Sequence, residues 1–345
     1  MASSEFKRNA AIIGSGSYVP EQIVPNTYFN ALLGEDVDTW LRENVQIYER
    51  RWCSKDQSTA DLIEQACVSA LESANIGAED IDLLIVATDT PEFVSPSTAS
   101  VIQDRLQMKN AGTFDVNTAC AGFVTALDIG AKFIQADQNY NLVMVVGAYA
   151  MSKYLNLQDK KTVTLFADGA AAVVLRATVE DKGLMQSKLL TKGEYNSWMG
   201  IYGGATHMPL SAVVLENKEH LLKFVKKIPT HINPEIWSEM IKNLCAKSNI
   251  LPSDIDHFFL TQININSIFA TMDVLGVDRE KAATIMHKFG YTGSAAIPMA
   301  FDIWNKEIGI RKQFGNSIFL EGNYFDFRMK DAIVRRQNES GQEYF

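Results

Sequence analysis

The chain carries an internal repeat, and this repeat constrains the fold more than any other feature of the sequence. Residues 70–82 (ALESANIGAEDID) and residues 244–256 (LCAKSNILPSDID) follow one pattern, in which a helix ends, the chain turns at Asn-Ile, and an apolar strand follows. Ile81 and Ile255 are 174 residues apart, about half of the 345 residues. A period of this length indicates duplication of a whole folding unit.

Other segments keep the same order in both halves. Residues 118–120 (TAC) open one helical pattern, and residues 292–294 (TGS) open another. We therefore expect two similar α/β halves, residues 1–178 and 179–345, with the first half carrying the candidate nucleophile. Apolar runs typical of strands alternate with amphipathic patterns typical of helices, as in a layered α/β fold. Strands are predicted at 11–14, 81–87 and 142–147, helices at 61–75 and 97–108, and two short apolar runs around a turn at Asp168-Gly169 within 162–175.

Cys120 lies where the strand-like run 112–116 gives way to a long helical pattern that includes Phe123. A thiolate is the nucleophilic form of cysteine, and a helix N-terminus lowers the pKa of a thiol. Free backbone N–H groups at such a corner stabilise a developing oxyanion. The position therefore predicts a reactive cysteine with a lowered pKa.

Composition excludes several classes of protein. The net charge is −9 and no Lys/Arg run stands out, so no nucleic acid or anionic membrane surface is expected as a partner. The four cysteines form neither a disulfide framework nor a metal-ligand pattern, and no metal site is predicted. No apolar run approaches the roughly 20 residues of a membrane span, and a cytoplasmic location is expected. Gly14-Ser15-Gly16 lacks the remaining parts of a dinucleotide-binding loop, so we discount a nicotinamide site.

Four motifs together resemble the thiolase superfamily, and most closely its ketoacyl synthase III branch. They are Asn117-Thr118-Ala119-Cys120-Ala121-Gly122-Phe123, Pro96-Ser97-Thr98-Ala99, Phe166-Ala167-Asp168-Gly169-Ala170-Ala171-Ala172 and Gly290-Tyr291-Thr292-Gly293-Ser294-Ala295-Ala296-Ile297-Pro298. The resemblance implies a five-layered αβαβα sandwich of two pseudo-repeated halves, normally a homodimer. It also implies that Cys120 is the acyl-accepting nucleophile, that no cofactor is needed, and that an acyl-CoA or acyl carrier protein thioester is the substrate.

The sequence departs from this family at two positions that act on malonyl groups. Thr261 stands where the family usually has a His, and Tyr291 stands where it usually has an Asn. The C-terminal loop at 322–327 has side chains where the family has glycines. Thr and Tyr can each donate one neutral hydrogen bond, but neither is an imidazole that exchanges protons near neutral pH. Loss of one oxyanion donor typically costs about 2.7–4 kcal/mol of barrier, so we expect decarboxylative condensation to be weakened.

Three functions are therefore considered. The first is acyl transfer through acyl-Cys120 to a non-standard acceptor, either a small-molecule amine or hydroxyl or a preactivated carbon nucleophile, in lipid or secondary metabolism. The second is conventional decarboxylating 3-oxoacyl-carrier-protein synthesis in which Thr261 and Tyr291 suffice. The third is a non-catalytic subunit that partners an active relative.

Further residues are candidates for binding or catalysis. Asp89 follows a predicted core strand, at the place where the related hydroxymethylglutaryl-CoA synthase branch has a glutamate base; the alternative is a carboxylate that caps the turn at Pro91. The resemblance to the ketoacyl synthase III branch implies that Trp40 stacks on the CoA adenine; the alternative is that its ring only packs against the rest of the protein. Arg42 would replace the CoA-binding Arg that falls at Asn44 here, and Phe123 is placed with the substrate-binding residues.

Overall fold

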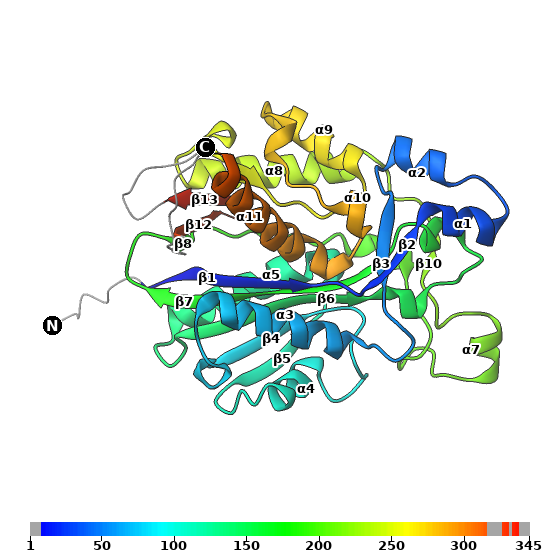
Figure 1. Ribbon diagram of the computed structural model, residues 1–345, viewed down its shortest axis with the longest axis horizontal. Helices are drawn as coiled ribbons and strands as arrows, with labels where there is room; N and C mark the ends of the chain where they lie inside the picture. Colours follow the sequence, from blue (N-terminus) through cyan, green and yellow to red (C-terminus); the bar gives the residue numbers. More distant parts are fainter. Residues whose placement is uncertain (1–7, 316–325, 331–332, 338–345) are drawn as a thin grey trace.

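The structure is a computed structural model that describes residues 8–315, 326–330 and 333–337 (Figure 1). The repeat seen in the sequence recurs in the order of its elements. Four elements of the first half have counterparts that begin 173 or 174 residues later in the second half. The pairs are α3 (Thr59–Ala74) with α8 (Ile232–Lys247), β4 (Leu83–Ala87) with β11 (His257–Phe258), the short turn η2 (Ala119–Ala121) with η7 (Gly293–Ala295), and α5 (Gly122–Ala136) with α11 (Ala296–Gly315).

The first half is built on a five-stranded mixed sheet with the order β1-β7-β6-β4-β5. Strand β4 pairs in parallel with both β5 and β6, while β7 runs antiparallel to β6 and β1. The bounds of the other strands are β1 (Asn9–Tyr18), β5 (Gly112–Val116), β6 (Leu142–Ala150) and β7 (Asp168–Thr178). The second sheet has the order β11-β13-β12-β8, with β8 (Gly183–Leu184), β12 (Asp326–Lys330) and β13 (Ile333–Gln337).

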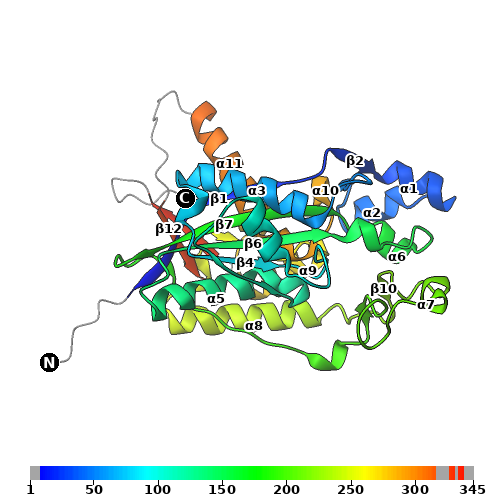
Figure 2. The ribbon, with the colours of Figure 1, turned by 90° about the horizontal axis from the view of Figure 1, so that it is seen from below.

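Helices separate and cover the two sheets. Helix α3 packs on one face of the first sheet, and α5 and α11 pack on its other face; Figure 2 shows α3 and α5 on opposite sides of β6 and β7. Helices α8 and α9 (Ile265–Leu275) pack on each other and cover the second half on the outside. This is the predicted layered αβαβα arrangement, with the central helix layer formed by α5 and α11.

The remaining elements lie mainly around the two sheets. They are β2 (Gln22–Pro25), α1 (Asn26–Leu33), α2 (Asp38–Asn44), β3 (Glu49–Trp52), α4 (Thr98–Arg105), α6 (Lys160–Val163), β9 (Met199–Gly200), α7 (Ala212–Glu216), β10 (Lys223–Phe224) and α10 (Met286–Phe289).

Two glycines in β1 explain the Gly14-Ser15-Gly16 motif. A Cβ atom on Gly16 would lie 2.3 Å from the backbone nitrogen of Ala70, and one on Gly14 would lie 2.6 Å from that of Ala74. Glycine is therefore required because α3 packs directly on β1 at these two positions. The motif lies within a strand and serves helix packing.

The central helices carry a second repeat that the sequence analysis missed. Asp128 in α5 and Asp302 in α11 are both buried, and each is paired with a lysine four residues later, Lys132 and Lys306. Asp302 also accepts a hydrogen bond of 2.8 Å from Ser15 Oγ in β1, which fixes α11 to the first sheet. The segment Ala119–Ala136 has the length and hydropathy of a membrane-spanning helix, but half of it is buried inside the protein as part of the central layer.

One local prediction was wrong. The segment around Asp168 contains no turn between two short runs, since β7 begins at Asp168 and continues unbroken to Thr178. The buried carboxylate of Asp168 accepts hydrogen bonds from the backbone nitrogens of Cys53 and Ser152, at 2.7 and 2.8 Å. Asp168 therefore joins three distant segments, and that role cannot be read from the local sequence.

Candidate active site

The carboxyl ends of three neighbouring parallel strands bring the candidate residues together. Strands β6, β4 and β5 are adjacent, with Ala87 at the end of β4 paired to Gly147 of β6 and Val116 of β5. Asp89 lies two residues beyond β4, and Tyr149 lies two residues beyond Gly147 on β6. Ligand sites of α/β proteins typically form at such carboxyl ends.

Cys120 lies in the turn η2, which the equivalent turn η7 of the second half supports. Ser294 Oγ donates a hydrogen bond of 2.9 Å to the carbonyl oxygen of Ala119, the residue before the cysteine. Ala119 has a φ of 47°, a left-handed conformation that is costly for a residue with a side chain. A Cβ on Gly122 would lie 3.1 Å from both Ser294 Oγ and Ala87 Cβ, so the two turns and β4 meet closely here. The second half of the repeat thus fixes the turn that carries the nucleophile.

A chain of hydroxyl groups leads to the sulfur. Thr261 Oγ1 donates a hydrogen bond of 3.2 Å to the Tyr291 hydroxyl, and the Tyr291 hydroxyl is itself hydrogen-bonded to the Cys120 thiol. Tyr291 is fully buried, and its ring lies edge-on to Phe166 with the centroids 5.5 Å apart. Thr261 and Tyr291 are therefore placed at the cysteine, while their correspondence to the His and Asn of the related family, and their roles, stay predictions.

The prediction of a lowered thiol pKa was wrong. Burial raises the pKa of the Cys120 thiol to about 11, and the nearby negative charge of Asp89 acts in the same direction. The hydrogen bonds from the Tyr291 hydroxyl and from the backbone lower this pKa only in part. Cys120 is itself half-buried, and the cost of removing a thiolate from water opposes the effect of the helix end.

Asp89 is held in place by its two neighbours in the chain. The backbone nitrogen of Thr90 donates to Thr88 Oγ1 at 3.0 Å, and Ala150 N donates to Thr90 Oγ1 at 2.9 Å. The Asp89 carboxylate bonds to its own backbone N–H, while its buried Oδ1 atom has no hydrogen-bond partner among the described residues. It does not cap the turn at Pro91 through that atom. Burial raises the pKa of Asp89 to about 6.

Three tyrosine hydroxyl groups lie within electrostatic range of this carboxylate. The pKa values of Tyr149, Tyr154 and Tyr291 are all raised, chiefly by burial, and in each case the charge of Asp89 adds to the shift. The ring centroids of Tyr149 and Tyr291 are 6.4 Å apart. The sequence analysis missed Tyr149, although its place two residues beyond the apolar run of β6 would have put it at the same sheet edge as Asp89.

The predicted substrate-binding residues lie in two elements, Trp40 and Arg42 in α2 and Phe123 at the start of α5. Phe123 is only 2% exposed and belongs to the main apolar core. Trp40 is 54% exposed on α2, so packing in a core does not account for it. Arg42 forms an ion pair with Asp38 at 2.7 Å and lies 4.9 Å from the centre of the Tyr48 ring.

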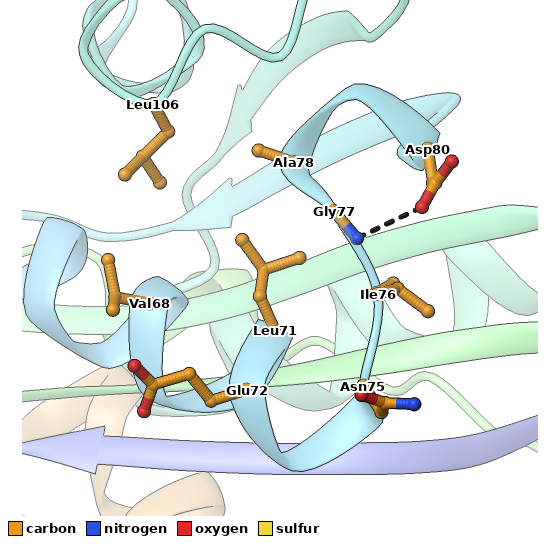
Figure 3. Close-up of a pocket in the computed structure, with 9 residues that line it drawn as sticks. All are labelled: Val68, Leu71, Glu72, Asn75, Ile76, Gly77, Ala78, Asp80 and Leu106. Atoms are coloured by element: carbon orange, nitrogen blue, oxygen red, sulfur yellow. Dashed lines mark hydrogen bonds between the residues drawn. The ribbon is translucent and has the colours of Figure 1, made fainter.

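Residues 322–325 of the C-terminal loop, where the family has glycines, lie outside the described residues. Figure 3 shows a surface depression at the C-terminal end of α3, lined by Leu71, Gly77 and Leu106 among others. It adjoins the end of β4 opposite to Asp89, since η1 (Ala78–Asp80) leads into the start of that strand.

Comparisons with known proteins agree with the fold and with the predicted family. The family model described as 3-oxoacyl-[acyl-carrier-protein (ACP)] synthase III matches residues 114–193, and the model of its C-terminal region matches residues 245–322. The beta-ketoacyl-[acyl-carrier-protein] synthase III of Clostridium perfringens is 36% identical over 317 residues, which cover 91% of this chain and 95% of the relative. The enzyme of the same name from Staphylococcus saprophyticus is 34% identical, over 85% of this chain and 88% of its own.

A solved structure shows the same architecture. The 3-oxoacyl-[acyl-carrier-protein] synthase III of Aquifex aeolicus has a TM-score of 0.79 to this chain at 25% identity, with 94% of this chain and 97% of that chain covered. The identity and the coverage of the two relatives above are sufficient to assign the family. The chain belongs to the beta-ketoacyl-acyl-carrier-protein synthase III family of thioester-dependent acyltransferases, within the thiolase superfamily.

Proposed function

We propose that this protein accepts an acyl group on Cys120 from a CoA or acyl-carrier-protein thioester and passes it to an acceptor other than malonyl carrier protein. The observation that carries the proposal is the composition of the site. The Cys120 thiol is hydrogen-bonded to Tyr291, Tyr291 accepts from Thr261, and a buried carboxylate, Asp89, lies nearby. The nucleophile of the family is kept, while the groups around it have changed.

The first half-reaction needs little beyond what these residues supply. The sulfur attacks the thioester carbonyl carbon, a new C–S bond forms, the bond to the carrier sulfur breaks, and the thiol proton leaves Cys120. Asp89 can take up that proton, because a carboxylate with a pKa of about 6 is ionised at neutral pH and is a stronger base than an ordinary aspartate. Backbone N–H groups of the turn would stabilise the oxyanion.

Malonyl groups fit the site poorly. Decarboxylation produces an enolate that needs hydrogen-bond donors, and the side-chain donors that the described residues place next to the sulfur are the hydroxyl groups of Tyr291 and Thr261, which cannot exchange protons near neutral pH as an imidazole can. The malonyl carboxylate would also approach the charge of Asp89. Two like charges about 4 Å apart repel by roughly 4 kcal/mol at the effective dielectric constant of partly buried sites.

Asp89 instead provides a base for an acceptor that must lose a proton before it attacks the acyl group. This fits a hydroxyl, an amine or an already activated carbon acid, and we extend the proposal to these classes. We also propose a homodimer, in which a second copy of the chain covers the edge strand β5 and the nearby side chains of Phe93 and Val94, both of which are exposed. Trp40 on α2 is the proposed contact for CoA.

Mass spectrometry after incubation with a panel of acyl-CoA donors tests the first step. We expect a mass increase equal to the acyl group on the peptide that contains Cys120, and none in Cys120→Ala. Absence of an adduct with every donor, or an adduct that persists in Cys120→Ala, would refute the proposal and favour a non-catalytic subunit.

A second assay separates the proposal from conventional synthesis. Labelled malonyl-carrier protein is added to the acylated enzyme, and the release of carbon dioxide is followed. Release at the rate of acyl discharge would establish the conventional decarboxylating reaction and overturn the proposed acceptor class.

A further inference from the structure

The carboxylate beside the cysteine lacks a positive partner. Among the residues that the structure describes, Asp89 forms no ion pair, and its buried Oδ1 atom accepts no hydrogen bond. A buried carboxylate is normally paired or hydrogen-bonded, because an isolated charge away from water is costly. An unpartnered oxygen at a reactive centre points to a ligand that supplies the missing partner.

The surroundings of Asp89 are aromatic and hydroxylic. Tyr149, Tyr154 and Tyr291 lie close enough for the carboxylate charge to act on all three, and Tyr149 and Tyr291 are 6.4 Å apart between ring centres. Two other carboxylates act on these tyrosines, and both are hydrogen-bonded. Glu92, which acts on Tyr154, accepts a hydrogen bond of 2.9 Å from the backbone nitrogen of Ala60 at the start of α3. Asp168, which acts on Tyr149, accepts from the backbone nitrogens of Cys53 and Ser152. The described neighbourhood therefore contains negative charge and electron-rich rings, and no positive charge within residues 8–315, 326–330 and 333–337 is among the causes of the Asp89 pKa shift.

This combination selects for cations. Ammonium groups are attracted to the faces of tyrosine rings as well as to carboxylates, and the attraction increases when water is excluded. An anionic acceptor would be repelled, and a neutral alcohol would give Asp89 one hydrogen bond but no opposite charge. A protonated amine supplies both the charge and the hydrogen bonds.

We infer that the acceptor is a primary amine, which binds as its ammonium ion between Asp89 and the tyrosines next to acyl-Cys120. The inference rests on the proposed function and names the substrate class of the same site. Asp89 takes one proton from the ammonium ion, which neutralises both buried charges. The free amine then attacks the thioester carbonyl carbon, a C–N bond forms, and the C–S bond to Cys120 breaks. The sulfur leaves as a thiolate and takes up the second proton of the amine, so that an amide and the free thiol are the products.

The test starts from protein acylated with octanoyl-CoA until mass spectrometry shows complete modification of Cys120. The acylated protein is freed of CoA and mixed with n-hexylamine, n-hexanol or malonyl-CoA, and loss of the adduct is timed. We expect hexylamine to discharge the protein with formation of N-hexyloctanamide, at least tenfold faster than hexanol. Acylated Asp89→Asn should lose this preference, while Glu92→Gln, the matched control carboxylate, should keep it.

A binding measurement tests the cation site without any acyl chemistry. Tetramethylammonium cannot be acylated, and we expect it to protect Cys120 of the unacylated protein from iodoacetamide, with the protection absent in Asp89→Asn. Failure of tetramethylammonium to protect, or discharge by hexanol or malonyl-CoA but not by hexylamine, overturns the inference and leaves acyl transfer through Cys120 in place. Failure of octanoyl-CoA and of every other donor to acylate Cys120 refutes the proposed function itself.

Discussion

Asp89→Asn is expected to stabilise the folded protein at neutral pH, although it removes the candidate base. Burial raises the pKa of Asp89 from 3.8 to about 6, which means that the fold disfavours the ionised carboxylate. One pKa unit corresponds to about 1.36 kcal/mol, so the ionised group costs the native state on the order of 3 kcal/mol at pH 7–8. Asparagine has nearly the same shape and no charge, and therefore avoids this cost.

The sign of the pH dependence follows from the same shift. Because the folded pKa lies above the unfolded pKa, the native state binds more protons between about pH 4 and pH 6. The free energy of unfolding of the wild type therefore falls as pH rises through this window and stays low above it. The advantage of the Asn variant should be about 3 kcal/mol at pH 8 and roughly half of that at pH 5.

Thermal unfolding provides the measurement. An unfolding entropy of about 2.1 cal/mol/K per residue gives about 0.7 kcal/mol/K for 345 residues, so 3 kcal/mol corresponds to an increase of about 4 °C in Tm at pH 8. Glu92→Gln is the control, because Glu92 accepts a hydrogen bond from Ala60 and a comparable gain is not expected. An Asn variant that melts at or below the wild type at pH 8, or whose advantage does not shrink at pH 5, would show that Asp89 is not held in an unfavourable charged state.

Two further predictions concern the second-half segment that contacts Cys120 and its turn, from Tyr291 into η7. Tyr291→Phe removes the hydroxyl that hydrogen-bonds the Cys120 thiol. Such a bond to a charged group is worth about 1.5–3 kcal/mol, so the thiol pKa should rise by about 1–2 units. The higher pKa lowers the thiolate fraction at pH 8 by about 10- to 100-fold, and the accompanying rise in intrinsic nucleophilicity offsets roughly half of this effect on a logarithmic scale. Alkylation of Cys120 by iodoacetamide at pH 8 should therefore slow by about 3- to 10-fold, and an unchanged rate would contradict the hydrogen bond. Gly293→Ala should destabilise the protein to urea by about 2–4 kcal/mol, because backbone strain and overpacking add at this position. Gly293 has a φ of 48°, and its new Cβ would lie 2.3 Å from a ring carbon of Tyr149. Gly276→Ala is the control, because Gly276 has a φ of 69° and open space around its Cβ position. It measures the cost of backbone strain alone, which should be about 1–2 kcal/mol. Equal losses of stability in the two variants would rule out the contact with Tyr149.

Most of the architecture could be predicted from the sequence, because it depends on periodic patterns. The repeat, the predicted strands and the helix predicted at 61–75 all correspond to elements of the structure. The helix predicted at 97–108 begins at Thr98, and Ser97 accepts a hydrogen bond from Ser100 N as an N-cap. The turn predicted at Asp168 was wrong because the local residues do not reveal its hydrogen-bond partners. These partners, Cys53 and Ser152, lie in other segments of the chain.

The site was predictable only in part, for a similar physical reason. Cys120 and Asp89 each follow a parallel strand of an apolar run, so their meeting at one sheet edge follows from the order of strands. The state of the thiol does not follow, because it depends on how much water the surrounding elements exclude. Tyr291 and Thr261 come from the second half, and their hydrogen bond depends on how the two halves pack.

The balance of charge in the site links these observations. A family member that decarboxylates malonyl groups must accommodate an anion and its enolate next to the cysteine, and neutral donors with an exchangeable proton serve that purpose. Here a carboxylate that is ionised at neutral pH, together with tyrosine and threonine hydroxyl groups, surrounds a thiol whose own pKa is about 11. The electrostatic energy of such a site is lowered most by a step that removes negative charge, either by acylating the sulfur or by transferring a proton to Asp89. Acylation of Cys120 removes the possibility of a second anion next to Asp89, and a positively charged acceptor then neutralises the carboxylate itself. The residues around the cysteine are therefore consistent with the proposed acceptor, because a carboxylate beside the sulfur favours a group that arrives with a proton to lose over one that arrives as an anion.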